Sequence, residues 1–147
     1  MELPFTVDQS GTSFIVLIFH DFVVKIPRFK DADYNRIMRT VNLHRRLSAQ
    51  FREVLPCKLV DGYIIMPRAK GERLDILQTR VSAATWNHIW TLRNTLVSSI
   101  KESGYKVYDL VANNLFYDDE TDKLTVVDLM DGNDQDERLI RSISTID

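Results

Sequence analysis

The sequence from Asp109 to Asp128 reads DLVANNLFYDDETDKLTVVD. Two short runs of β-branched, aromatic and leucine residues, Leu115–Tyr117 and Leu124–Val127, flank the acidic run Asp118–Asp122. Apolar runs separated by a polar turn predict a β-hairpin with a solvated tip. The apolar neighbours of Asp128 place this acid in a stretch that should be buried, where a carboxylate without a partner is costly. A ligand is therefore expected at this end of the hairpin.

The segment before this stretch predicts helices. Apolar residues recur at helical spacing between Ser82 and Gly104, and a glycine suits the position after a helix end. Trp86 and Trp90, four residues apart, are expected to be core anchors rather than a ligand platform. A shorter helix is expected at 72–78, and Pro67–Gly71 is typical of a connector between two parts of a chain.

The first 66 residues predict a hairpin, a helix and a second hairpin. The segments are Phe14–Phe19 with Phe22–Ile26, residues 33–51, and Cys57–Val60 with Tyr63–Met66. The strands of the first hairpin are apolar without alternation, which predicts burial on both faces. Lys25 is conspicuous there because a buried charge needs a partner or a ligand. A last short helix is expected at 138–143.

Two motifs stand at the spacing found in protein kinases. The kinase catalytic loop has an Asp followed by Leu, an Asn five positions after the Asp, and a metal-binding Asp at the end of the next hairpin. Asp109, Asn114 and Asp128 have this spacing. The chain resembles protein kinases over nearly its whole length, with Lys25 in the third strand and Met66–Gly71 at the hinge.

The resemblance implies an α+β, two-lobed protein kinase-like fold formed by a single domain, residues 1–147. Residues 1–66 would form a β-rich N-lobe with one helix, 67–71 the hinge, and 72–147 a minimal, truncated helical C-lobe. It also implies an ATP- and Mg²⁺-dependent phosphotransferase, as a protein Ser/Thr kinase or an autokinase. Phosphoryl transfer depends on positioning and charge neutralisation, so each residue has an expected role.

Asp109 is expected to be the catalytic base and Lys25 the contact to the nucleotide phosphates. Asn114 and Asp128 are expected to bind the metal. The residues expected to contact the nucleotide are Gly11, Thr12, Ser13, Lys25, Met66 and Asn114. The phosphate loop is reduced, since Gly11 is its only glycine and the neighbouring hydroxyls would supply further donors.

The sequence departs from the kinase pattern at three positions and in its length. Val107 replaces the usual His, Leu129-Met130 replaces Phe-Gly, and Thr40–Asn42 stands where a helix Glu normally orients the lysine. The sequence ends soon after Asp128, which leaves little room for an activation segment and substrate-supporting helices. In this respect it is similar to minimal kinases of bacterial, phage or effector type.

Two other functions remain open. The missing helix Glu and the reduced glycine loop favour a pseudokinase, or a protein-binding module gated by nucleotide. A small-molecule kinase similar to the aminoglycoside and choline kinases is the third possibility. It is disfavoured because those enzymes build their acceptor pocket from a large helical insert, which this sequence lacks.

Composition restricts the partners. The net charge is −2 with both signs interspersed, so nucleic acid is not expected as a partner. Cys57 is the single cysteine, and His20, His44 and His88 lack metal-ligand spacing. No signal peptide or long apolar segment indicates a membrane. We expect a cytoplasmic protein, or an effector exported by another signal, that acts with a protein substrate or an activating protein partner.

Overall fold

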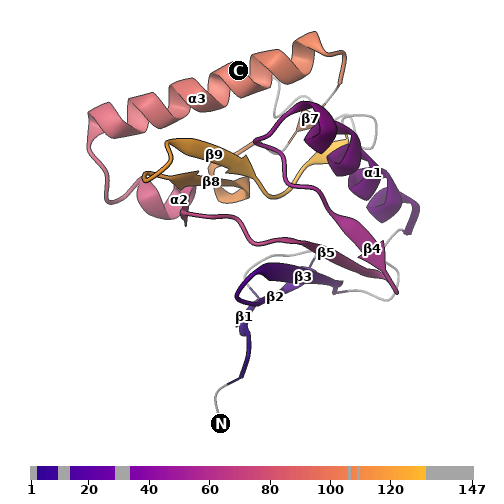
Figure 1. Ribbon diagram of the computed structural model, residues 1–147. Coiled ribbons are helices and arrows are strands. Elements are labelled where there is room, and N and C mark those ends of the chain that lie inside the picture. The colour runs from indigo at the N-terminus through magenta and orange to yellow at the C-terminus, as the bar shows by residue number, and fades with distance from the viewer. Residues whose placement is uncertain (1–2, 10–13, 29–33, 106, 109, 132–147) are drawn as a thin grey trace. The chain divides into compact units, whose positions relative to one another are not determined.

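The computed structural model describes residues 3–9, 14–28, 34–105, 107–108 and 110–131 of the chain, and their architecture is α+β (Figure 1). The chain divides into two compact units, Met1–Ala69 and Lys70–Asp147. The first unit contains one sheet and the second contains two, and each unit has its own buried residues.

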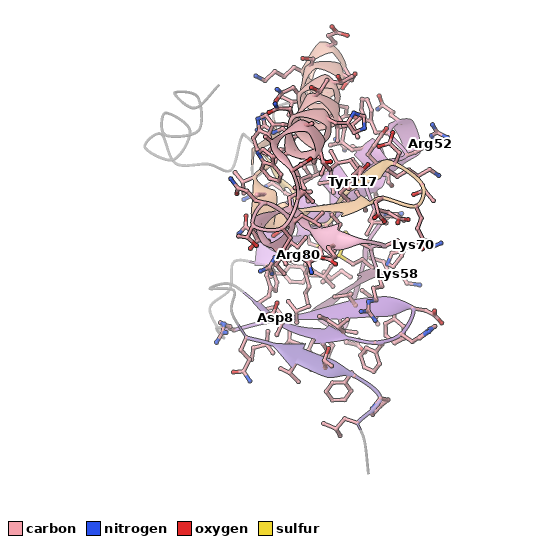
Figure 2. The ribbon with its side chains drawn as sticks, turned by 90° about the vertical axis from the view of Figure 1, so that its left-hand side faces the viewer. Asp8, Arg52, Lys58, Lys70, Arg80 and Tyr117 are labelled. Atoms are coloured by element: carbon pink, nitrogen blue, oxygen red, sulfur yellow. The ribbon has the colours of Figure 1, made fainter. Side chains whose placement is uncertain are left out.

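The first unit is built on a five-stranded antiparallel sheet. Its strands are β1 Thr6–Asp8, β2 Phe14–Ile18, β3 Phe22–Pro27, β4 Lys58–Val60 and β5 Tyr63–Pro67. They lie in the order β1-β2-β3-β5-β4, so β3 is the central strand. The edge strands β1 and β4 carry charged residues, Asp8 and Lys58, which Figure 2 labels. Charges on edge strands discourage pairing with other chains.

The helix α1, Tyr34–Gln50, packs against this sheet. Val41 of α1 lies in a buried cluster with Cys57, Ile64 and Met66, and Ile37 packs against the same cluster. His44 is also buried, and its Nδ1 donates to the Leu55 carbonyl at 3.0 Å. Burial of these side chains supplies the main stabilising free energy of the unit.

The expectation that the first hairpin is buried on both faces is wrong. No described side chain of β2 or β3 is fully buried, and Phe22 is 40% exposed. Alternation along β3 puts Val23 on the face covered by α1 and Val24 on the other face. The face of the hairpin that α1 does not cover also carries apolar residues, and a continuous apolar run normally indicates a strand that is covered on both faces.

The second unit is built around the hairpin β8 Leu115–Asp118 and β9 Lys123–Val126. The two-residue strand β6 Glu72–Arg73 pairs with β8, and β7 Val107–Tyr108 pairs with β10 Met130–Asp131. The long helix α3, Ala83–Glu102, packs against β9 and runs above the hairpin in Figure 1. Its buried residues are Ile89, Leu96 and Ile100.

The remaining elements of this unit are the four-residue helix α2, Leu74–Leu77, and the 3-10 helix η1, Ala112–Asn114. The expected helix at 72–78 is therefore shorter, because its first two residues pair with β8 as a strand. The expected helix at 138–143 lies outside the described residues. Within the described part of the chain, no helix is long and apolar enough to cross a membrane.

The long helix agrees with its expected ends. Ser82 is the N-cap of α3, and its hydroxyl accepts a hydrogen bond from the Thr85 amide at 3.2 Å. Gly104 follows the helix with φ +92°, a conformation that glycine adopts without steric cost. Trp86 and Trp90 are half-buried rather than fully buried, and their rings stack with centroids 5.5 Å apart.

Candidate functional site

The base of the hairpin β8–β9 brings Asn114 next to the residue that precedes Asp128. The paired strands end at Leu115 and Val126, both fully buried. Beyond them the Val127 amide donates to the Asn114 carbonyl at 3.0 Å, which continues the ladder by one pair. Asn114 and Asp128 are both half-buried. Asn114 and Asp128 lie on opposite sides of the hairpin in the sequence, and the pairing of the two strands brings their backbones close together.

The loop that carries Asn114 is held at both ends. The Asn114 amide donates to the Val111 carbonyl at 2.9 Å and closes the 3-10 turn η1. At the other end, Leu110 is buried, and its carbonyl accepts a hydrogen bond from Arg93 Nε at 3.0 Å. The Arg93 guanidinium carbon also lies 5.0 Å from the centroid of the Trp90 ring. These contacts join α3, the loop and the hairpin.

An ion pair borders the loop. α2 packs against η1, and Asp75 of α2 accepts two hydrogen bonds from Arg73, at 2.6 and 3.0 Å. The hydrogen bonds from Arg73 hold the pKa of the Asp75 carboxyl below its usual range, against an opposing desolvation effect. Asp75 therefore stays ionised at neutral pH and adds a fixed charge beside η1.

Lys25 belongs to the first unit and lies on the central strand β3. It is half-buried, and its cross-strand neighbours are Val16 and Ile64. Since cross-strand neighbours share a face, Lys25 lies on the face of the sheet that carries the buried Ile64. α1 packs on this face and contains no acidic residue, so the helix offers no Glu.

Met66 is placed in the core of the first unit. It is 3% exposed and lies in the cluster with Val41, Cys57 and Ile64. Its packing is thus explained without a ligand, and a nucleotide contact for Met66 stays a prediction. Four other expected site residues lie outside the described residues, namely Gly11, Thr12, Ser13 and Asp109.

The tip of the hairpin contains contacts that the sequence did not predict. The acidic turn is exposed as expected, with Asp122 at φ +53°. The Tyr117 hydroxyl donates to Asp122 Oδ1 at 2.7 Å, and His88 Nε2 of α3 lies 2.8 Å from the same oxygen. Figure 2 labels Tyr117 among the side chains of β8. These residues fasten the tip of the hairpin to the first half of α3.

These hydrogen bonds shift the pKa values of the Asp122 carboxyl and the Tyr117 hydroxyl. The Tyr117 hydrogen bond, followed by that of His88, keeps the pKa of the Asp122 carboxyl below its usual range. The same bond to Asp122, with burial second, raises the pKa of Tyr117 to about 12. No sequence pattern links positions 88, 117 and 122, and only the fold brings them together.

The side chains of Asn114 and Asp128 carry oxygen atoms of the kind that hard cations bind. Mg²⁺ prefers carboxylate and carbonyl oxygens and usually keeps several waters, so one carboxylate and one amide form an adequate protein contribution. Among the described residues, no group of three or more His, Cys, Asp and Glu side chains could hold a metal ion. Asn114 and Asp128 are two residues, and one of them is an amide, so this statement does not cover them.

No protein-family model matches the sequence, and a search of the curated proteins found no significant match.

Proposed function

We propose that the protein is an ATP- and Mg²⁺-dependent phosphotransferase with a minimal protein kinase-like fold. The acceptor is a Ser or Thr hydroxyl of a protein substrate or of the chain itself. Asn114 and Asp128 bind the metal, Lys25 contacts the nucleotide phosphates, and Asp109 accepts the proton of the attacking hydroxyl. An activating protein partner completes or stabilises the site.

The hydrogen bond between the Val127 amide and the Asn114 carbonyl is the observation that carries this proposal. It fixes the backbone of the expected amide ligand beside the residue preceding the expected carboxylate ligand. The buried pair Leu115 and Val126 lies directly below and makes this end of the hairpin rigid. Rigid placement matters because catalysis of phosphoryl transfer is mostly positioning and charge neutralisation.

The position of Lys25 supports the phosphate role. Lys25 is half-buried on the central strand of the sheet, and its ammonium group carries the charge that complements a nucleotide phosphate. The absence of acids from α1 means that a Glu of this helix does not orient the lysine.

Transfer of labelled γ-phosphate tests the proposal. The purified chain is incubated with labelled ATP, with and without Mg²⁺, alone and with a general protein acceptor. Label should enter protein only with Mg²⁺. Asp109→Ala and Asp128→Ala should each reduce the rate by at least about 100-fold, the lower range for loss of a general base or of charge stabilisation.

Asp119→Ala is the matched control, because Asp119 is an exposed carboxylate at the hairpin tip. This variant should transfer phosphate at the wild-type rate. Transfer that persists in both Asp109→Ala and Asp128→Ala would disprove the proposed roles.

The second candidate function is a pseudokinase that binds a protein partner under nucleotide control. The observation favouring it is the acid-free helix α1, since kinases use a helix Glu to hold the lysine in its active position. Nucleotide binding without any phosphoryl transfer, even in the presence of Mg²⁺, would favour this function over the enzyme.

A further inference from the structure

Arg93 occupies an unusual place on α3. It is half-buried on the long helix, between the fully buried Ile89 and the buried Leu96. Its guanidinium contacts Leu110, Asn94 and Trp90. Nε donates to the Leu110 carbonyl at 3.0 Å, Nη1 donates to Asn94 Oδ1 at 3.0 Å, and the carbon lies 5.0 Å from the Trp90 ring centroid.

Each of these contacts restricts the side chain. Stacking over Trp90 orients the planar guanidinium, and the hydrogen bond to Asn94 fixes its rotation. In this orientation the Nε–H donates to the Leu110 carbonyl. A charged donor to a carbonyl is stronger than a neutral one, so this bond is a firm attachment of the loop.

The loop attached by Arg93 leads directly to the proposed metal ligands. Leu110 is the residue after Asp109 in the sequence, and its side chain is 5% exposed. Beyond it, the Asn114 amide donates to the Val111 carbonyl, and the amide of Val127, the residue before Asp128, donates to the Asn114 carbonyl. One guanidinium thus anchors the beginning of a chain of contacts that ends at the metal ligands.

We propose that Arg93 is a positioning residue, which fixes the loop from Leu110 to Asn114 for phosphoryl transfer. Its contribution to catalysis rests on the proposed function, whereas its hold on the loop does not. Arg93 itself touches neither nucleotide nor acceptor in this proposal. It acts through the Leu110 carbonyl, and its loss displaces the loop without removing a reacting group.

Amide hydrogen exchange measured by NMR tests the hold on the loop without any assay of activity. The variant is Arg93→Met, which keeps a long stem on the helix and removes the charge and all donors. The Asn114 and Val127 amides should exchange on the order of 10- to 100-fold faster, the effect of losing a charged hydrogen bond. The Ile89 and Ile100 amides, in the second and last turns of α3, should keep their protection.

Two further variants separate positioning from general destabilisation. Lys101→Ala removes an exposed cation from the same helix and should leave the loop amides as in the wild type. Arg93→Lys keeps a cation with ammonium donors but lacks the guanidinium plane, so it should recover part of the protection. Exchange at Asn114 and Val127 that is unchanged in Arg93→Met would overturn the proposal.

Kinetics provide the second readout. In Arg93→Met, kcat should fall on the order of 100-fold, as for a displaced catalytic group, while the KM for Mg·ATP changes much less. Arg93→Lys should recover part of kcat. A rise in KM with kcat unchanged would overturn the catalytic part. If the wild type transfers no phosphate, the proposed function fails, and faster loop exchange in Arg93→Met still supports Arg93 as the residue that positions the loop.

Discussion

Gly71 occupies a position where any side chain would collide with the neighbouring strand. Its φ is +90°, and a Cβ built on it would lie 2.1 Å from the Tyr117 carbonyl oxygen of β8. The atoms it would meet belong to the backbone, so they cannot move aside without shifting the hairpin. This glycine allows β6 to pair closely with β8.

We expect Gly71→Ala to destabilise the protein by about 3 kcal/mol or more. The left-handed backbone costs roughly 1–2 kcal/mol with a side chain, and overpacking adds about 1–3 kcal/mol. Gly62→Ala is the control, because Gly62 has a similar φ of +84° with nothing within 4 Å of its Cβ position. It should show the backbone cost alone. Urea unfolding measures both, and equal losses would contradict the collision.

At the scale of single residues, the sequence indicated which residues to consider for the candidate site, but it did not predict the contacts around them. The types and spacing of Asn114 and Asp128 were readable because each belongs to a short motif. Arg93 was not, since its contact to Leu110 spans 17 positions and leaves no periodic signal. His88 and Asp122, 34 positions apart, were missed for the same reason.

At the scale of the elements, the side chain of Ser82 stabilises the first turn of α3. The Ser82 hydroxyl accepts from the Thr85 amide, one of the amides at a helix start that lack a partner within the helix. Ser82→Ala should therefore reduce the free energy of unfolding by about 1 kcal/mol, and Ser82→Gly by only a few tenths, since glycine is a tolerated N-cap. Chemical denaturation would detect the difference. Equal effects would show that the cap hydrogen bond contributes little.

The hydrogen bond at the hairpin tip should stabilise the protein less at strongly alkaline pH. The pKa of Tyr117 is raised to about 12 in the folded protein, against about 10 for a free tyrosine. Because the folded pKa is higher, the stabilisation is complete below pH 10 and is lost as the pH rises through about 12. Tyr117→Phe should remove this loss, so the stability difference between wild type and variant should shrink across that window.

The tyrosinate absorbance supplies the direct measurement. Difference titration of wild type against Tyr117→Phe should isolate one group that titrates near pH 12. His88→Ala serves as the comparison, because it removes the second partner of Asp122 and leaves the Tyr117 hydrogen bond. A Tyr117 that titrates near pH 10 would contradict the described hydrogen bond.

The longer elements of the fold followed from sequence, and the shortest ones did not. The hairpins are apolar runs bounded by polar turns, and the helices α1 and α3 carry period-3.6 patterns. The predictions for these elements are confirmed within a few residues. β6, β7 and β10 contain two residues each, too few for any period. Their pairing is decided by partners distant in sequence, as for Arg73 and Phe116.

At the scale of the whole molecule, the division into two units separates the expected nucleotide contacts. Lys25 belongs to Met1–Ala69, whereas Asn114 and Asp128 belong to Lys70–Asp147. Each unit has a core that is formed by its own residues, for example Val41 and Ile64 in the first. The proposed function therefore assigns the phosphate contact to the first unit and the metal ligands to the second. A substitution in each unit, combined with a measurement of nucleotide binding, tests the two assignments separately.

Stabilisation by nucleotide is the corresponding prediction. A ligand that binds only the folded state at 100 times its Kd adds about 2.7 kcal/mol, which corresponds to a rise in Tm of roughly 5–10 °C for a chain of this size. We expect ATP with Mg²⁺ to produce such a rise. Asp128→Ala should remove the dependence on Mg²⁺, because it deletes the carboxylate ligand. Lys25→Met should weaken binding with or without the metal, because it deletes the phosphate contact.

Two controls make the thermal measurement specific. Asp119→Ala removes an exposed acid and Lys58→Met an exposed lysine on the edge strand β4, so both should respond to Mg·ATP as the wild type does. A Tm that does not change with millimolar Mg·ATP would contradict nucleotide binding by both units. A rise lost in Asp128→Ala but kept in Lys25→Met would limit the nucleotide contacts to the second unit, because the metal ligands belong to that unit and the lysine does not.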